Sequence, residues 1–149
     1  MFDFFKKKKE PVSPYFDFLD KIDDLKKMIP EFDPYDMQTL RQTINTEKFI
    51  ISKYNEFFDS DLSALSAEEL KAVKSNYELD QDDLAWDLSV YYLMQQILAL
   101  AQEGILQSDI KKRLPDANPQ HITRICKRFD ADGVIKREKK GSSYYITLP

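Results

Sequence analysis

A change in the spacing of apolar residues near the C-terminus limits the possible folds more than any other feature of this sequence. Ile122, Cys126 and Phe129 recur at the spacing of one helical face, which predicts a helix over residues 119–132. After Gly133, apolar and polar residues alternate as they do in β-strands. The sequence therefore predicts a helix that leads directly into β-structure.

The ends of these elements also carry local signals. Asn118 is a good N-cap, and Pro119 suits the first helical position, where its missing N–H is not needed. We expect residues 134–138 and 144–148 to pair as two strands, with residues 139–143 at the tip of their hairpin. The helix and hairpin are thus predicted to form one compact region.

A short strand and a short helix are expected before this region. Residues 88–103 predict an amphipathic helix that ends at Gly104, and residues 105–107 predict a brief strand. Ser108 is expected to cap a helix over residues 109–114. The predicted order is helix, strand, helix, turn, helix and hairpin.

This order resembles the winged helix-turn-helix family, in particular the module of MarR-like and related bacterial regulators. The resemblance rests on Ile105-Leu106-Gln107-Ser108-Asp109-Ile110 and on the stretch from Ile122 to Ile135. It covers residues 88–149. It implies a recognition helix at residues 119–132 and a wing at residues 134–148, which together bind double-stranded DNA.

The resemblance also implies which side chains meet DNA. Because the apolar face of helix 119–132 points inward, its other side is expected to be exposed. The candidates for reading bases, from the first turns of this helix, are Gln120, His121, Thr123 and Arg124. The candidates for phosphate contacts are Lys127 and Arg128 in this helix and Lys111, Lys112 and Arg113 in the preceding one. The wing residues Lys136, Arg137, Lys139 and Lys140 are expected to enter the neighbouring minor groove or to clamp its phosphates. About six phosphate contacts predict a log–log slope of affinity against salt near −5.

Charge is divided unevenly along the chain. Residues 1–89 contain 12 Lys and Arg against 20 Asp and Glu, whereas residues 90–149 contain 10 against 6, for a total net charge of −4. Such asymmetry is more informative than the total. We therefore predict an acidic helical domain over residues 15–87, for dimerisation or partner binding, followed by the winged helix-turn-helix at residues 88–149. The predicted fold class is mainly α with a small β-hairpin wing.

The acidic domain contains several helix signals. Residues 15–29 place apolar side chains on one helical face, and Asp33 is a plausible N-cap for a second helix beginning at Pro34. Ser66 with Glu69 forms a capping-box pattern for a third helix. Asp80 could cap the next helix.

Residues 1–14 are expected to be a flexible basic N-terminus. Lys6 to Lys9 could attract a membrane surface or another polyanion, but a solvated end is the simpler interpretation. No apolar run is long enough for a transmembrane helix, and no signal peptide is expected. Cys126 is the single cysteine, which excludes an intramolecular disulfide and favours a cytoplasmic setting; we expect it to be a core residue rather than a redox switch.

Three functions fit these observations. The first is a DNA-binding transcriptional regulator. The second is a protein-interaction adaptor built on a winged-helix module, since a fold does not fix a function. The third is a plasmid or phage replication accessory factor. No enzyme motif, metal-ligand spacing or cofactor motif is expected. MarR-like proteins dimerise through helices after the wing, and this sequence stops at Pro149, so we expect any homodimer to use the N-terminal helices.

Overall fold

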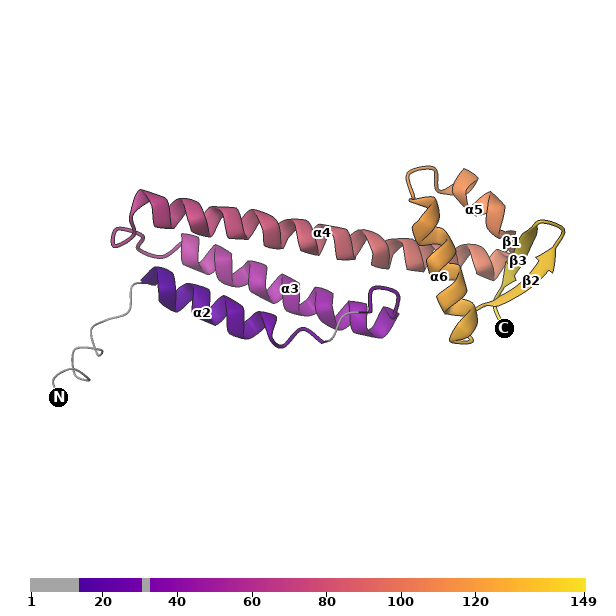
Figure 1. The fold of residues 1–149 in the computed structure, drawn as a ribbon, viewed down its shortest axis with the longest axis horizontal. Helices are drawn as coiled ribbons and strands as arrows, with labels where there is room; N and C mark the ends of the chain where they lie inside the picture. The colour runs from indigo at the N-terminus through magenta and orange to yellow at the C-terminus, as the bar shows by residue number, and fades with distance from the viewer. Residues whose placement is uncertain (1–13, 31–32) are drawn as a thin grey trace. The chain divides into compact units, whose positions relative to one another are not determined.

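The protein is mainly helical, with a small antiparallel sheet near its C-terminus (Figure 1). The computed structural model describes residues 14–30 and 33–149. The elements are α2 (Pro14–Lys26), α3 (Met37–Phe58), α4 (Ala67–Glu103), β1 (Ile105–Leu106), α5 (Gln107–Arg113), α6 (Pro119–Ala131), β2 (Lys136–Lys140) and β3 (Ser143–Thr147). The predicted flexible segment 1–14 lies outside the described residues except for Pro14, which begins α2.

Contacts divide the described chain into two compact units. The helical unit contains residues 14–30 and 42–85, and the C-terminal unit contains residues 33–41 and 86–149. The second unit therefore includes a segment, residues 33–41, that lies far from the rest of the unit in sequence. The sequence did not predict this.

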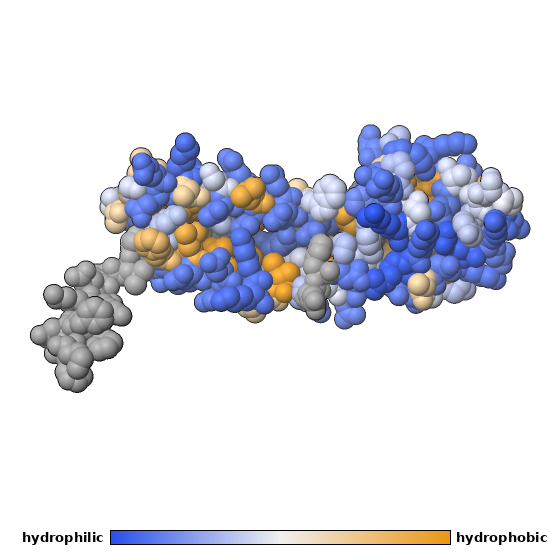
Figure 2. Space-filling model, in the orientation of Figure 1, coloured by the Kyte–Doolittle hydropathy of each residue, from blue (hydrophilic) through white to orange (hydrophobic). Residues whose placement is uncertain are grey.

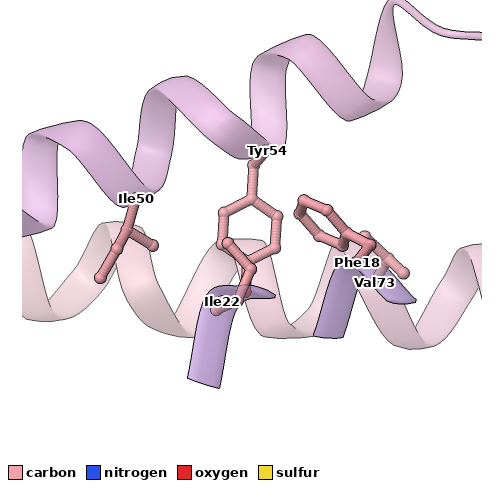
Figure 3. Close-up of a cluster of buried hydrophobic side chains, with 5 residues drawn as sticks. All are labelled: Phe18, Ile22, Ile50, Tyr54 and Val73. Carbon is pink, nitrogen blue, oxygen red and sulfur yellow. The ribbon is translucent and has the colours of Figure 1, made fainter. Parts of the chain in front are cut away.

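The helical unit is held together by an aromatic and aliphatic cluster. Phe18 and Ile22 of α2 pack against Tyr54 of α3 and Val73 of α4, and all four side chains are buried (Figure 3). The ring centroids of Phe18 and Phe57 lie 4.1 Å apart in a stacked arrangement. Consecutive helices of this unit run in opposite directions, so their apolar faces meet in one layer (Figure 1).

The starts of α3 and α4 test two predicted caps. The capping box of α4 is confirmed, because the Ser66 N–H donates to Glu69 Oε1 at 3.0 Å and the Glu69 N–H donates to Ser66 Oγ at 3.1 Å. The prediction of Asp33 as the cap of α3 is wrong. Asp36 directly precedes Met37 and accepts from the Gln38 N–H at 3.1 Å, whereas Pro34 falls in a turn before the helix.

The predicted helix starts at Asp80 and at residue 88 are also wrong, since α4 runs unbroken from Ala67 to Glu103. Neither glycine nor proline interrupts it. Asp80 lies within the helix and is buried. It accepts a hydrogen bond from Tyr54 Oη at 2.6 Å, and its other oxygen lies 2.9 Å from Lys26 Nζ. A carboxylate that looked like a cap is therefore a partner in the core of the helical unit.

Removing the Tyr54 hydroxyl tests this buried contact. Hydrogen bonds to a charged group contribute more than neutral ones, so Tyr54→Phe is expected to lower the free energy of unfolding by about 2 kcal/mol. Tyr77→Phe is a matched control, because Tyr77 Oη donates to Asn55 Oδ1 at an exposed site. Chemical denaturation should show a clearly smaller loss for the control. Equal losses would mean that the buried Tyr54–Asp80 hydrogen bond stabilises the fold no more than the exposed Tyr77–Asn55 bond does.

The sheet of the C-terminal unit has the strand order β1-β3-β2, and both pairings are antiparallel. Ile105 of β1 pairs with Ile146 of β3, and Lys140 of β2 pairs with Ser143 of β3. The hairpin is confirmed, but its boundaries differ from those predicted. The first strand begins two residues later because the N–H groups of Val134 and Ile135 bond to the carbonyl of Phe129 at the end of α6.

Of the two short helices of this unit, α6 begins where its local sequence signals predict and α5 does not. Asn118 Oδ1 accepts from the Gln120 N–H at 2.9 Å and Pro119 is the first residue of α6, as predicted. However, α5 begins at Gln107 rather than Asp109, and Ser108 is not its cap. Instead, the Ser108 N–H donates to Ser143 Oγ of β3 at 3.2 Å. The hairpin therefore satisfies a backbone donor at the start of α5.

A pair of glycine substitutions tests the packing at the end of α4. Gly104 and Gly133 both have positive φ, which costs other residues about 1–2 kcal/mol. A Cβ at Gly104 would lie 2.3 Å from Tyr145 Oη, whereas one at Gly133 would meet nothing within 4 Å. Gly104→Ala is therefore expected to lower the free energy of unfolding by at least about 1 kcal/mol more than Gly133→Ala. Thermal and urea denaturation of both variants measure the difference, and equal losses would contradict this packing.

Candidate nucleic-acid interface

One face of α6 is buried in the C-terminal unit. Ile122, Ile125, Cys126 and Phe129 are between 0% and 3% exposed. Burial raises the pKa of the Cys126 thiol to about 12, so this side chain is a protonated core residue at neutral pH, as expected from its spacing. Because these four side chains fix the rotation of α6, they decide which polar side chains face outward.

A second face of α6 carries polar and basic side chains at helical spacing. Gln120, Thr123, Arg124 and Lys127 line a shallow depression of about 300 Å³ together with Pro119. Gln120, Arg124 and Lys127 are exposed, and Thr123 is half-buried. Within the described part of the chain, neither Arg124 nor Lys127 has an ion-pair partner. The surface over α6 is mostly hydrophilic (Figure 2). We call these four residues the basic face of α6.

His121 lies on a third face, and the expectation that it is exposed is wrong. Its Nδ1 atom lies 3.2 Å from Tyr35 Oη, and its ring meets the ring of Trp86 edge-on at 5.3 Å. Both partners belong to the C-terminal unit. His121 is therefore a half-buried contact of α6 with the rest of its own unit.

Arg128 lies two helical turns further along the same face and also has partners within the protein, so the expectation that it is freely exposed is wrong. Its guanidinium forms an ion pair with Asp33 and another with Asp132, where Nε lies 2.8 Å from Oδ2. The hydrogen bond from Arg128, followed by that from the Tyr35 N–H, holds the pKa of Asp33 below its usual value of 3.8. Residues 33–35 thus attach to α6 at two points.

The three basic residues of α5 differ in the contacts that their side chains make. Lys111 Nζ donates to the carbonyl oxygens of Pro115 and Ala117, so its charge closes the turn before α6. Lys112 forms an exposed ion pair with Asp109 at 3.2 Å, which leaves it accessible to a stronger anion. The Arg113 Nη2 atom lies 3.9 Å from Glu103 Oε2 at the end of α4, and both side chains are exposed.

The hairpin likewise contains engaged and free basic groups. The Arg137 side chain is only 10% exposed, lies over the Tyr144 ring at 4.0 Å and donates to Gln107 Oε1 at 3.2 Å. Lys136 is paired with Glu138 at 2.9 Å on the surface. The free cations lie at the tip, where Lys139 and Lys140 are exposed and have no ion-pair partner among residues 14–30 and 33–149.

A cleft connects the basic face of α6 with the hairpin tip. It has a volume of about 360 Å³ and lies between α5, the start of α6 and β3. Its lining includes four hydroxyl-bearing side chains that sequence reasoning did not single out as a group, namely Ser108, Ser142, Ser143 and Tyr144, and it also includes Thr123. The hairpin brings Ser142, Ser143 and Tyr144 next to α5, where Ser143 Oγ accepts from the Ser108 N–H.

The described residues contain no group of three His, Cys, Asp or Glu side chains placed to hold a metal ion. Among the helices of the same residues, none is both long and apolar enough to cross a membrane. Comparisons with protein-family models, curated proteins and solved structures gave no match for this chain. The geometry of the C-terminal unit is therefore the basis for a proposed function.

The contact between Asp33 and Arg128 predicts a pH dependence. Because the pKa of Asp33 is lowered in the folded state, the contact contributes stability above about pH 4, and this contribution is lost as the pH falls through the lowered value. In a carbon-13 NMR titration, Arg128→Ala should move the pKa of Asp33 back toward 3.8. Asp61, whose pKa is lowered by bonds from Ser63, should not move and serves as the control. An unchanged pKa of Asp33 would contradict the contact.

Proposed function

We propose that the C-terminal unit is a winged helix-turn-helix that binds double-stranded DNA, and that the protein acts as a transcriptional regulator. The element order of α4, β1, α5, α6, β2 and β3, with a β1-β3-β2 sheet, is the arrangement expected for such a module. The observation that carries the proposal is the basic face of α6. Its two cations have no partner in the described chain, and they lie on the helix that the fold would present to the major groove.

The roles assigned within this face follow from chemistry. The Gln120 amide offers a donor and an acceptor that match the edge of adenine, and the Arg124 guanidinium offers two donors that match the two acceptors of guanine, so these two residues are the base-reading candidates. Lys127, further along the helix, suits a phosphate. The contacts of His121 and Arg128 favour a positioning role for these two residues, since they hold α6 rather than extend from it.

The hairpin would supply a second contact region. Lys139 and Lys140 at its tip are free to meet phosphates or the adjacent minor groove, whereas Arg137 is engaged within the unit. The hydroxyl-lined cleft between the tip and α6 suits a sugar–phosphate backbone, because hydroxyls commonly donate to phosphate oxygens. With about four free cations, we expect a log–log slope of affinity against salt near −4.

Fluorescence anisotropy with a random pool of double-stranded DNA across a salt series tests the proposal. Arg124→Ala/Lys127→Ala is expected to weaken binding at least about tenfold at low salt and to make the salt slope shallower. The matched control is Lys71→Ala/Lys74→Ala, which removes two exposed cations at the same spacing on the helical unit.

The control changes the net charge by the same amount but leaves the basic face of α6 intact, so it should keep wild-type affinity within about twofold. Equal losses in the two variants would show attraction by net charge alone and would contradict a specific face. Absence of binding at low salt would overturn the DNA proposal and favour an adaptor that uses the same face for a protein partner.

A further inference from the structure

The segment before α3 places a carboxylate at the edge of the basic face of α6. Arg128 lies one helical turn after Arg124 and directly follows Lys127, so it borders that face. Its Nη1 atom nevertheless forms an ion pair with Asp33. The Arg128 side chain is 33% exposed and that of Asp33 is 41% exposed, so the pair lies at the surface. A phosphate at the edge of the basic face would therefore compete with Asp33 for the same guanidinium.

The Asp33 carboxylate is a close substitute for a phosphate at this position. Carboxylates and phosphates both accept charge-assisted hydrogen bonds from arginine, in the same planar geometry. The hydrogen bond from Arg128 lowers the pKa of Asp33 below 3.8, so the carboxylate is charged at neutral pH. The Tyr35 N–H donates to its Oδ1 atom at 3.1 Å, which leaves Oδ2 directed at Arg128. One fixed anion thus occupies a cation that DNA could use.

A second carboxylate would keep Arg128 in place if Asp33 were removed. Asp132 Oδ2 lies 2.8 Å from the Nε atom of Arg128, whereas Asp33 binds the terminal Nη1 atom. The contact with Asp132 is local, since the two residues are four positions apart in the chain. Loss of the Asp33 contact alone would therefore leave the side chain oriented on α6, with its terminal nitrogens available to a phosphate.

The contacts between this segment and α6 are separate from the core of the C-terminal unit. They join Asp33 to Arg128 and the Tyr35 hydroxyl to His121 Nδ1, at 3.2 Å in the second case. The ion pair is partly exposed, and such pairs contribute little to stability individually. The buried face of α6 does not depend on them. The segment can therefore leave α6 without unfolding the unit.

We propose that residues 33–35, which we call the latch, inhibit DNA binding by withholding Arg128 from the phosphate backbone. This inference rests on the DNA-binding function proposed above and adds its regulation. With the latch on α6, the four free cations of α6 and the hairpin tip bind DNA. When the latch is released, Arg128 becomes a fifth cation, and the log–log slope of affinity against salt becomes steeper by about one.

Fluorescence anisotropy of the full chain with a random pool of double-stranded DNA, across a salt series, tests the latch. Asp33→Asn keeps the shape of the side chain but removes its charge. It should raise the affinity at least about threefold at low salt and steepen the salt slope by about one. Asp132→Asn is the matched control, because it removes the same charge from the same guanidinium but leaves the latch in place. Its gain should be clearly smaller, with an unchanged slope.

Arg128→Ala shows whether the gain depends on this guanidinium. In the Arg128→Ala background, Asp33→Asn should raise the affinity much less, because no cation remains to be released. An equal gain in that background, or an equal gain from Asp132→Asn, would reduce the effect to net charge and overturn the latch. An unchanged affinity of Asp33→Asn beside a wild type that binds DNA would overturn the latch and leave the proposed function standing. If neither wild type nor Asp33→Asn binds DNA at low salt, both proposals fail.

Discussion

The burial of one face of α6 is the constraint on which the rest of the C-terminal unit depends. Ile122, Ile125, Cys126 and Phe129 can all be buried only in one rotation of the helix. That rotation turns Arg124 and Lys127 outward and turns Arg128 toward Asp33. The packing of apolar groups therefore determines which basic groups are available to a partner. The number of basic residues in the helix does not.

The segment before α3 adds a second constraint. Through Asp33 and Tyr35 it contacts α6 at Arg128 and His121, a separation of 95 and 86 residues in sequence. An exposed ion pair contributes little to stability by itself. Together, however, these contacts hold α6 along the face that carries His121 and Arg128, which lies between its buried face and its basic face. Two residues that are candidates for DNA contact in the sequence thus acquire a role within the protein.

Local chemistry explains what the sequence could predict. The cap at Asn118, the capping box at Ser66 and the helix end at Gly104 each depend on residues within a few positions of one another, and each is confirmed. The apolar spacing of α6 was equally informative, because three turns of helix repeat the same signal. The existence of α6 and of the hairpin, and the burial of the apolar residues of α6, follow from such short-range patterns.

The remaining features depend on contacts between distant residues. Asp80 has the sequence character of a cap, yet Tyr54 and Lys26 supply partners that allow it to stay inside a continuous helix. His121 looked like a surface histidine because Tyr35 and Trp86 leave no local signal. The first strand of the hairpin begins later than predicted because the N–H groups of Val134 and Ile135 bond to the carbonyl of Phe129 in α6. In each case a tertiary partner outweighed a local preference.

A nitrogen-15 NMR map of the chain with a short DNA duplex at low salt tests directly whether the basic face of α6 binds DNA. The proposed interface predicts that the largest shifts fall on Gln120, Thr123, Arg124 and Lys127, with a second group at residues 139–143. The face of His121 and Arg128 should move much less, because it is occupied by the protein itself. Shifts concentrated on that face or on the helical unit, with the basic face of α6 unmoved, would contradict the account.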